Sequence, residues 1–325
     1  MLMSCYLVFK KLLAFVAVAL VLCSCGGEEK KTARNAGAND STTLTIAVFP
    51  SLDALPLMLA NDWGVLDSLG VAANFKVYRS QMDCEKTLAE NNADVALTDI
   101  FRVAWWQWQK KPVRFAFSTR REMAIVPNKA LRISSINRLD DRMIAMSRFS
   151  LDDYYCDKVI KLITKRKGQI LKAQINSVEL RAKMLCSGQF DAAILSQMQL
   201  YKVKAAGFKP LTANTELAEG FAGFAFNMKS FATDRKRTQM LKLQRAYDIV
   251  VERLGRNATM PGIEESTRQA MFLDAPTMEK INAKKDFMKA AAVKSSLITE
   301  ATAWLKEIGA VGREFNSDTL VVDNR

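Results

Sequence analysis

Polar side chains gather where short apolar runs of this sequence end and amphipathic runs begin. The set consists of the polar residues Ser51, Asp53, Ser80, Gln81, Thr98, Asp99, Ser147, Arg148, Ser150, Ser196 and Gln197, together with the apolar Leu52 between the first two. In open α/β sheets, ligands bind at the carboxyl ends of the strands. Helices begin there with free N–H groups and the positive end of their dipole. The pattern therefore predicts a site that holds a small polar or anionic molecule by hydrogen bonds.

Each of these residues also has a structural interpretation. Ser, Thr and Asp are the favoured residues at helix N-termini, so for any one of them a helix cap is a stronger interpretation than a ligand contact. Arg148 is the one cation of the set, and a solvated surface arginine is the alternative there. Asp53 and Asp99 could form a carboxylate pair for acid–base chemistry, but helix capping is the stronger interpretation.

Residue usage excludes several kinds of catalysis. The chain has no histidine, and histidine is the usual general base near neutral pH and the commonest metal ligand. Serine–histidine catalysis, cysteine–histidine catalysis and histidine-held metals are therefore excluded. Cys84, Cys156 and Cys186 follow no metal-binding spacing; one disulfide is conceivable, but three small buried residues is the favoured interpretation. We expect no catalytic residue, no metal and no cofactor.

The expected site depends on an alternation of strands and helices from Leu44 onward, which is typical of parallel α/β folds. Strands are expected at 44–49, 75–78, 94–97, 113–117, 122–126, 142–146, 170–176, 191–195 and 221–227. Helices are expected at 53–64, 81–91, after Asp99, at 150–165 and at 178–187. The remainder is mostly helical, at 234–254, 264–272, 276–288 and 296–308, with 319–323 as an edge strand or extended tail.

Three helix starts carry capping signals. Asp53 is expected to cap the first helix, where a proline in the first turn costs little. Ser80 with Asp83, and Ser150 with Asp153, match the capping-box spacing.

The N-terminus carries a different kind of signal. Lys10 and Lys11 precede the apolar run 12–22, which is too short to cross a hydrocarbon core that needs roughly 20 residues. A basic end, a short apolar core and small residues predict a cleaved export signal at 1–24. The residues up to Cys25 resemble the bacterial lipobox, which implies a lipid on that cysteine. An ordinary secretory signal or an uncleaved anchor is the alternative.

The segment 25–43 is polar and without periodicity, so it is expected to be a flexible tether. The net charge of +13 at pH 7 fits a nucleic-acid binder, a protein on an anionic membrane surface or a binder of anionic solutes. Export argues against nucleic acid, and the basic run from Lys158 to Lys167 is expected to be a solvated helix face.

Several segments together resemble one family. They are LTIAVFPSLDALPLMLANDWGVLDSLGV (44–71), ADVALTD (93–99), SSINRLDDRMIAMSR (134–148), LRAKMLCSGQFDAAILSQMQLYKVKAAGFKPL (180–211) and TEATAWLKEIGAV (299–311). This series resembles the periplasmic substrate-binding proteins of ABC importers, in the branch of sulfonate, taurine, nitrate and thiamine-precursor binders. Phe101 and Arg102 depart from the family, where many relatives keep small residues.

The resemblance implies the type 2 periplasmic-binding fold, an α/β fold of two lobes, each a mixed sheet flanked by helices, with a helical C-terminal segment. Lobe 1 would comprise 44–120 and 222–325, and lobe 2 would comprise 121–221. The chain would cross between the lobes near 118–121 and 219–224, and a ligand would lie in the cleft.

The function expected from this resemblance is a monomeric periplasmic lipoprotein that delivers a small-molecule solute to an ABC permease and ATPase, from either membrane. One alternative is a lipid-anchored sensor or scaffold with the same fold. Another is an enzyme related to pyrimidine-forming thiamine-synthesis proteins, but those depend on active-site histidines, and this chain has none.

Overall fold

The computed structural model describes residues 42–323, apart from 165, 212–214 and 257–258. The expected signal peptide, the lipid site at Cys25 and nearly all of the expected tether lie outside the described residues. Within them, no helix is both long enough and apolar enough to cross a membrane.

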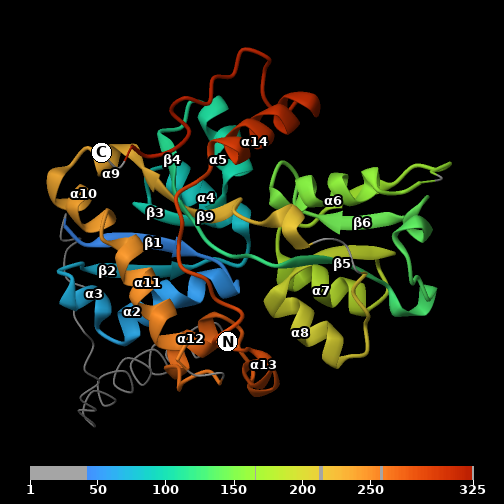
Figure 1. Cartoon of the computed structure of the whole chain (residues 1–325), viewed down its shortest axis with the longest axis horizontal. Coiled ribbons are helices and arrows are strands. Elements are labelled where there is room, and N and C mark those ends of the chain that lie inside the picture. Colours follow the sequence, from blue (N-terminus) through green and yellow to red (C-terminus); the bar gives the residue numbers. More distant parts are fainter. Residues whose placement is uncertain (1–41, 165, 212–214, 257–258, 324–325) are drawn as a thin grey trace, which may run out of the picture. The chain divides into compact units, whose positions relative to one another are not determined.

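The first lobe is built on a five-stranded sheet of order β2-β1-β3-β9-β4 (Figure 1). Its strands are β1 (Leu44–Val48), β2 (Ala73–Val77), β3 (Val95–Asp99), β4 (Val113–Ser118) and β9 (Ala222–Asn227). Strands β1, β2 and β3 are parallel, whereas β9 runs antiparallel to both β3 and β4. The carboxyl ends of β1 and β3 therefore lie at the same edge of the sheet.

The second lobe is built on a four-stranded sheet of order β5-β8-β6-β7. Its strands are β5 (Met123–Pro127), β6 (Met143–Met146), β7 (Leu171–Gln174) and β8 (Ala192–Ser196). Strand β6 is parallel to β7 and β8, and β5 is antiparallel to β8. The predicted mixed sheets are confirmed in both lobes.

Helices flank both sheets. The first lobe contains η1 (Leu52–Ala54), α2 (Leu55–Asp62), α3 (Val65–Ser68), α4 (Gln81–Ala89) and α5 (Ile100–Trp108). The second contains η2 (Lys129–Leu131), η3 (Ile136–Leu139), α6 (Leu151–Lys161), α7 (Val178–Cys186), α8 (Gln197–Ala205) and η4 (Thr215–Ala218). Each of α4, α5, α6 and α8 begins directly after a strand or a short turn, so its N-terminus lies at the edge where the expected site residues are.

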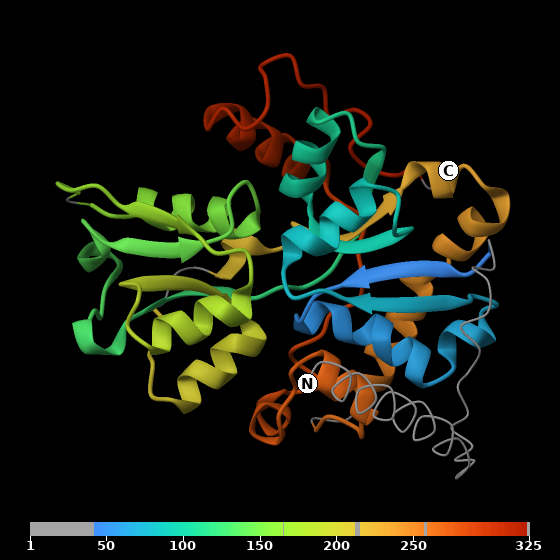
Figure 2. The same ribbon diagram turned by 180° about the vertical axis from the view of Figure 1, so that it is seen from behind.

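Two connections link the lobes, between β4 and β5 and between η4 and β9 (Figure 2). They are hydrogen bonded to each other, because the Thr119 N–H donates to the Ala222 carbonyl at 2.8 Å. A third segment lies beside them: Ser118 and Ala291 exchange N–H···O bonds of 2.8 and 3.0 Å. The C-terminal part of the chain therefore runs along the crossing.

The C-terminal part is helical but more interrupted than expected. It contains α9 (Met228–Phe231), α10 (Asp234–Met240), α11 (Leu243–Leu254), α12 (Glu265–Ala270), α13 (Ala275–Lys280) and α14 (Ser295–Glu307). The expected helix 234–254 is two helices separated by a turn at Leu241 and Lys242, and α11 packs against α2. The expected helix 276–288 ends at Lys280, and the Asp286 carboxylate accepts the Asn282 N–H at 2.8 Å in place of a helical carbonyl. Val321 forms an isolated parallel bridge with Phe115 of β4, but residues 318–320 form a turn, so the expected strand 319–323 is reduced to this bridge.

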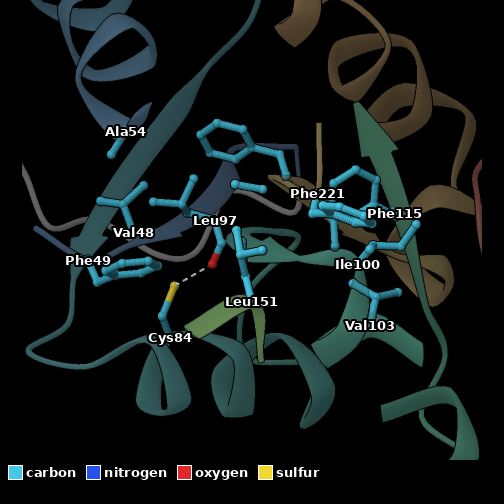
Figure 3. Close-up of a cluster of buried hydrophobic side chains, with 14 of the residues drawn as sticks. Val48, Phe49, Ala54, Cys84, Leu97, Ile100, Val103, Phe115, Leu151 and Phe221 are labelled. Atoms are coloured by element: carbon cyan, nitrogen blue, oxygen red, sulfur yellow. Dashed lines mark hydrogen bonds between the residues drawn. The ribbon is translucent and has the colours of Figure 1, made fainter. Parts of the chain in front are cut away.

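An apolar core underlies the edge where α5 begins. Val48, Leu97, Ile100 and Phe221 are buried together there (Figure 3). The buried Cys84 thiol donates to the Leu97 carbonyl at 3.5 Å, and burial raises its pKa, so it remains a protonated core group.

The cysteine prediction is partly wrong. Cys84 and Cys156 are buried, but Cys186 is exposed, and all three are free. Cys186 is the last residue of α7, where the helix end faces solvent.

Aromatic rings join the lobes on the α14 side. The Phe101 ring stacks on Tyr154 with centroids 4.6 Å apart, and it meets Trp304 edge-on at 5.2 Å. These residues come from α5, α6 and α14 respectively. Aromatic pairs of this kind contribute about 0.5–1.5 kcal/mol beyond the burial of their area. The bulk of Phe101, a departure from the resembled family, therefore stabilises the junction of three helices.

Candidate functional site

The structure places the expected site residues at the carboxyl ends of β1, β3, β6 and β8 or just beyond β2. All of them are buried except Arg148, which is exposed. The Arg148 guanidinium lies 5.2 Å from the centroid of the Phe149 ring, so the interpretation as a surface arginine fits. Leu52 is a core residue.

Asp53 forms a buried ion pair, and the expectation that it caps the first helix is wrong. Its Oδ2 accepts from Nε and Nη2 of Arg121 at 3.1 and 2.9 Å and from the Thr119 hydroxyl at 3.1 Å. The Ser51 hydroxyl donates to Oδ1. Asp53 lies inside the short turn η1, whose N-cap Ser51 makes no side-chain cap. Arg121, from the segment that crosses between the lobes, binds the Asp53 carboxylate, which local sequence would predict to cap the helix.

A second buried cluster centres on Glu85. Its Oε1 accepts from Gln81 Nε2 and from the Thr98 hydroxyl, each at 2.7 Å, and its Oε2 accepts from Arg102 Nε at 2.6 Å. Gln81 Oε1 accepts from Arg121 Nη1 at 3.4 Å. One hydrogen-bonded network thus runs from the end of β1 to the start of α5.

Asp99 connects this network to the second lobe. Its Oδ1 accepts the Arg102 N–H at 2.9 Å and so caps α5. Its Oδ2 accepts from Gln81 Nε2 at 2.6 Å and from the Leu151 N–H, the first of α6, at 3.0 Å. Burial and the nearby Glu85 charge raise the pKa of Asp99 to about 6. The predicted capping role is confirmed and extends to two helices, one in each lobe.

On the second lobe, Ser147 and Ser150 shape the start of α6. The Ser150 hydroxyl donates to the Ser147 carbonyl at 2.7 Å and accepts the Asp152 N–H at 3.2 Å. The Ser147 hydroxyl donates to Asn176 Oδ1 at 3.3 Å. The expected capping box of Ser150 with Asp153 does not form, because the Asp153 carboxylate accepts the N–H of Phe149 and not that of Ser150.

The remaining site residues have local partners. The Ser80 hydroxyl accepts the Asp83 N–H at 3.2 Å, which confirms Ser80 as the cap of α4. The Asp83 carboxylate accepts from the Ser80 hydroxyl at 2.6 Å, whereas a full capping box would have it accept the Ser80 N–H. The Ser196 hydroxyl donates to Gln199 Oε1 at 2.8 Å, and Gln197 Nε2 donates to the Tyr201 hydroxyl at 3.4 Å. Among the described residues, these bonds do not reach the Asp53 or Asp99 clusters.

The charged residues that organise the site were missed from sequence. They are Glu85, Arg102, Arg121, Asp152 and Arg181, all buried. A signal existed for Glu85, because it lies one helical turn after Gln81 and shares its face. Arg121 lies in the expected crossing segment, but nothing local indicated its partner.

The charges of this cluster are paired internally. Arg121 pairs with Asp53 at 2.9 Å, Arg102 with Glu85 at 2.6 Å and Arg181 with Asp152 at 2.5 Å. Asp99 is the remaining carboxylate, held by N–H donors. Among the described residues, no group of three or more cysteine or acidic side chains could hold a metal ion. The arrangement is suited to hydrogen bonding with a polar solute or to holding the lobes together.

No family model and no curated protein sequence matches the chain. Solved structures match its fold. The periplasmic aliphatic sulphonate binding protein of Escherichia coli has a TM-score of 0.67 at 11% identity, over 87% of this chain and 92% of that one. The ligand binding component of an ABC-type import system from Staphylococcus aureus has a TM-score of 0.69 at 12% identity, over 86% and 96%. The periplasmic nitrate-binding protein of Synechocystis PCC 6803 has a TM-score of 0.62 at 9% identity, over 84% and 83%.

These relatives share little sequence with this chain, so they establish the architecture and not the ligand. The likeness covers 84–87% of this chain. The chain has the two-lobed α/β fold of periplasmic binding proteins.

Proposed function

We propose that this chain is an extracytoplasmic solute-binding lipoprotein that captures a small polar or anionic molecule between its lobes and delivers it to an ABC importer. The observation that carries the proposal is the position of the polar network. It lies at the carboxyl ends of β1, β3 and β6, where the two lobes meet, and it joins them through Asp99 and Leu151. Structures with this fold are named as a sulphonate binding protein, a nitrate-binding protein and the ligand binding component of an ABC-type import system.

The location and the anchor are part of the proposal. A mature N-terminus at Cys25, acylated, with the tether 25–43 would hold the binding lobes at high effective concentration near an ABC permease and ATPase. The protein would act as a monomer at the periplasmic face of a membrane, without nucleic acid and without catalysis. We also propose the lobe boundaries expected from the sequence, with lobe 1 formed by 44–120 and 222–325 and lobe 2 by 121–221.

Native mass spectrometry of freshly purified protein tests the function directly. A retained solute would appear as a mass difference that disappears on unfolding. A panel of sulfonates, pyrimidines, carboxylates, oxyanions and neutral polar compounds should then include one that raises the melting temperature by mass action. If nothing is retained and no compound changes the melting temperature, the proposal is wrong, and a sensor or scaffold becomes the better explanation.

A matched pair of variants separates binding from stability. Thr98→Ala removes the hydroxyl that donates to Glu85 at 2.7 Å inside the network, and it should weaken solute binding. Thr87→Ala removes an exposed hydroxyl that donates to the Asp83 carbonyl on α4, and it should leave binding unchanged. Equal solute affinity in both variants would place the solute elsewhere.

The anchor has its own test. Cys25→Ser should abolish metabolic labelling with a fatty acid and release the protein from membranes. A Cys25→Ser protein that is still lipidated would contradict the proposed lipid site without affecting the solute-binding proposal.

A further inference from the structure

Asp99 occupies a position where a free anion could bind. The N-terminus of α6 presents free N–H groups and the positive end of a helix dipole, which together favour negative charge. The Leu151 N–H, the first of this eleven-residue helix, donates 3.0 Å to Asp99 Oδ2. Asp99 belongs to the other lobe, at the end of β3. The anion at this helix terminus is therefore a side chain of the protein itself.

The loop before α6 is shaped to present these groups to the first lobe. Phe149 has a φ of +56°, a left-handed conformation that costs energy for a residue with a large side chain. Its ring stacks on Trp105 of α5, with centroids 6.2 Å apart. The neighbouring Arg148 carbonyl accepts from Arg102 Nη1 at 3.4 Å. These contacts of Arg148 and Phe149 with α5 hold the loop in this conformation.

Among the described residues, each buried cation of the cluster is paired, and Arg148 at its edge is exposed. Arg121, Arg102 and Arg181 each pair with a buried carboxylate at 2.9 Å or less. The buried Arg102 Nη2, however, has no hydrogen-bond partner. Because Glu85 already balances the guanidinium charge, an uncharged oxygen of a solute, such as a carbonyl or hydroxyl, is sufficient to accept from Nη2.

We propose that the Asp99 carboxylate holds the N-terminus of α6 against the first lobe even when no solute is bound. Because this carboxylate already occupies the anion-binding position at the helix N-terminus, free oxyanions are excluded from it, and the protein selects uncharged polar solutes. The fastening depends only on the contacts above. The selectivity rests on the proposed solute-binding function.

The test uses hydrogen exchange of the full chain, stripped of co-purified solute by unfolding and refolding. In the wild type, the first turn of α6 should be protected. Asp99→Gly removes the carboxylate that accepts the Leu151 N–H. Exchange in the first turn of α6 should therefore accelerate about tenfold, the factor expected for the loss of one hydrogen bond to a charged group. Formate, a free carboxylate, should restore protection in Asp99→Gly and should raise its melting temperature more than that of the wild type. Sodium chloride at equal ionic strength should do neither.

Asp94→Asn is the matched control. Asp94 is also a buried carboxylate next to β3 that accepts a backbone N–H, from Thr45 at 2.8 Å, but its other partner is Lys236 of the first lobe. This variant should lose stability without faster exchange in α6. Asp99→Asn provides a second variant if the glycine variant does not fold, because its amide oxygen can still cap α5 while its NH2 cannot accept from Leu151.

Three results would overturn the proposal. One is rapid exchange of the α6 first turn in the stripped wild type. Another is unchanged exchange in both Asp99 variants. The third is formate stabilising the wild type as strongly as Asp99→Gly. If the first turn is protected but no solute binds, the fastening stands and the proposed function fails.

Discussion

The Arg121–Asp53 pair gives the sharpest prediction about stability. Both side chains are nearly inaccessible, at 4% and 0% exposure, and two guanidinium nitrogens lie 2.9 and 3.1 Å from one carboxylate oxygen. Arg121→Met keeps much of the volume but leaves the Asp53 carboxylate buried without its cation. Breaking a buried pair from one side costs about 3–5 kcal/mol. We expect the lower end, about 3 kcal/mol, because Ser51 and Thr119 still donate to Asp53.

The measurement is a double-mutant cycle by urea unfolding, followed by far-UV circular dichroism. Asp53→Asn alone leaves the guanidinium buried beside a neutral amide and should also destabilise. The double variant, Asp53→Asn with Arg121→Met, should be more stable than the sum of the single effects predicts, by about 2 kcal/mol. Its slope against urea should match that of the wild type.

The adjacent arginine provides the control. Arg120 pairs with Glu122 at the surface, where the side chains are 33% and 32% exposed. Arg120→Met should therefore cost less than about 1 kcal/mol. If Arg121→Met costs no more than Arg120→Met, or if the two changes in the cycle add, the buried pair does not have the role assigned to it here.

Three further predictions address other parts of the fold. Because the pKa of Asp99 is about 6 in the folded state and about 3.9 when unfolded, the folded state retains a proton between these values. The free energy of unfolding should fall as pH rises from about 4 to about 6, by about 2–3 kcal/mol, and urea titrations of Asp99→Asn should lack this fall. Gly223→Ala would place its Cβ 2.1 Å from a β4 carbonyl oxygen, so thermal melts should show a loss of about 3 kcal/mol in the free energy of unfolding. Gly262 has open space around it, so Gly262→Ala should change the free energy of unfolding by less than about 1 kcal/mol. Lys158→Gln should cost less than about 1 kcal/mol in the same melts, because its pair with Glu300 is 33% and 41% exposed.

Local patterns predicted most of the elements correctly. Apolar alternation located the nine strands within a few residues, and Ser80 with Asp83 marked the start of α4 as capping geometry requires. The errors fall where a distant partner overrides a local preference. Asp53 pairs with Arg121 and does not cap a helix. The expected helix 276–288 ends early because the Asp286 carboxylate accepts the Asn282 N–H.

In the candidate site, too, local rules predicted some residues correctly and missed those whose partners are distant in sequence. The rule that ligands meet strand ends selected Gln81, Thr98 and Asp99, which the network includes. It also selected Ser196 and Gln197, whose bonds run elsewhere. It could not select Arg121, because an arginine between two strands has no local feature that distinguishes it from a solvated one.

The sequence by itself determined the alternation of strands and helices, the absence of histidine chemistry and the edges where polar side chains would collect. These depend on residue type and on spacing within one or two helical turns. Only the tertiary structure decided which charges meet, since Asp53 and Arg121 are 68 positions apart and Asp99 and Leu151 are 52 apart. Pairing over such separations depends on how two sheets are connected and packed, and burial then makes each partner obligatory. A carboxylate that sequence presents as a helix cap thereby becomes the contact that joins two lobes.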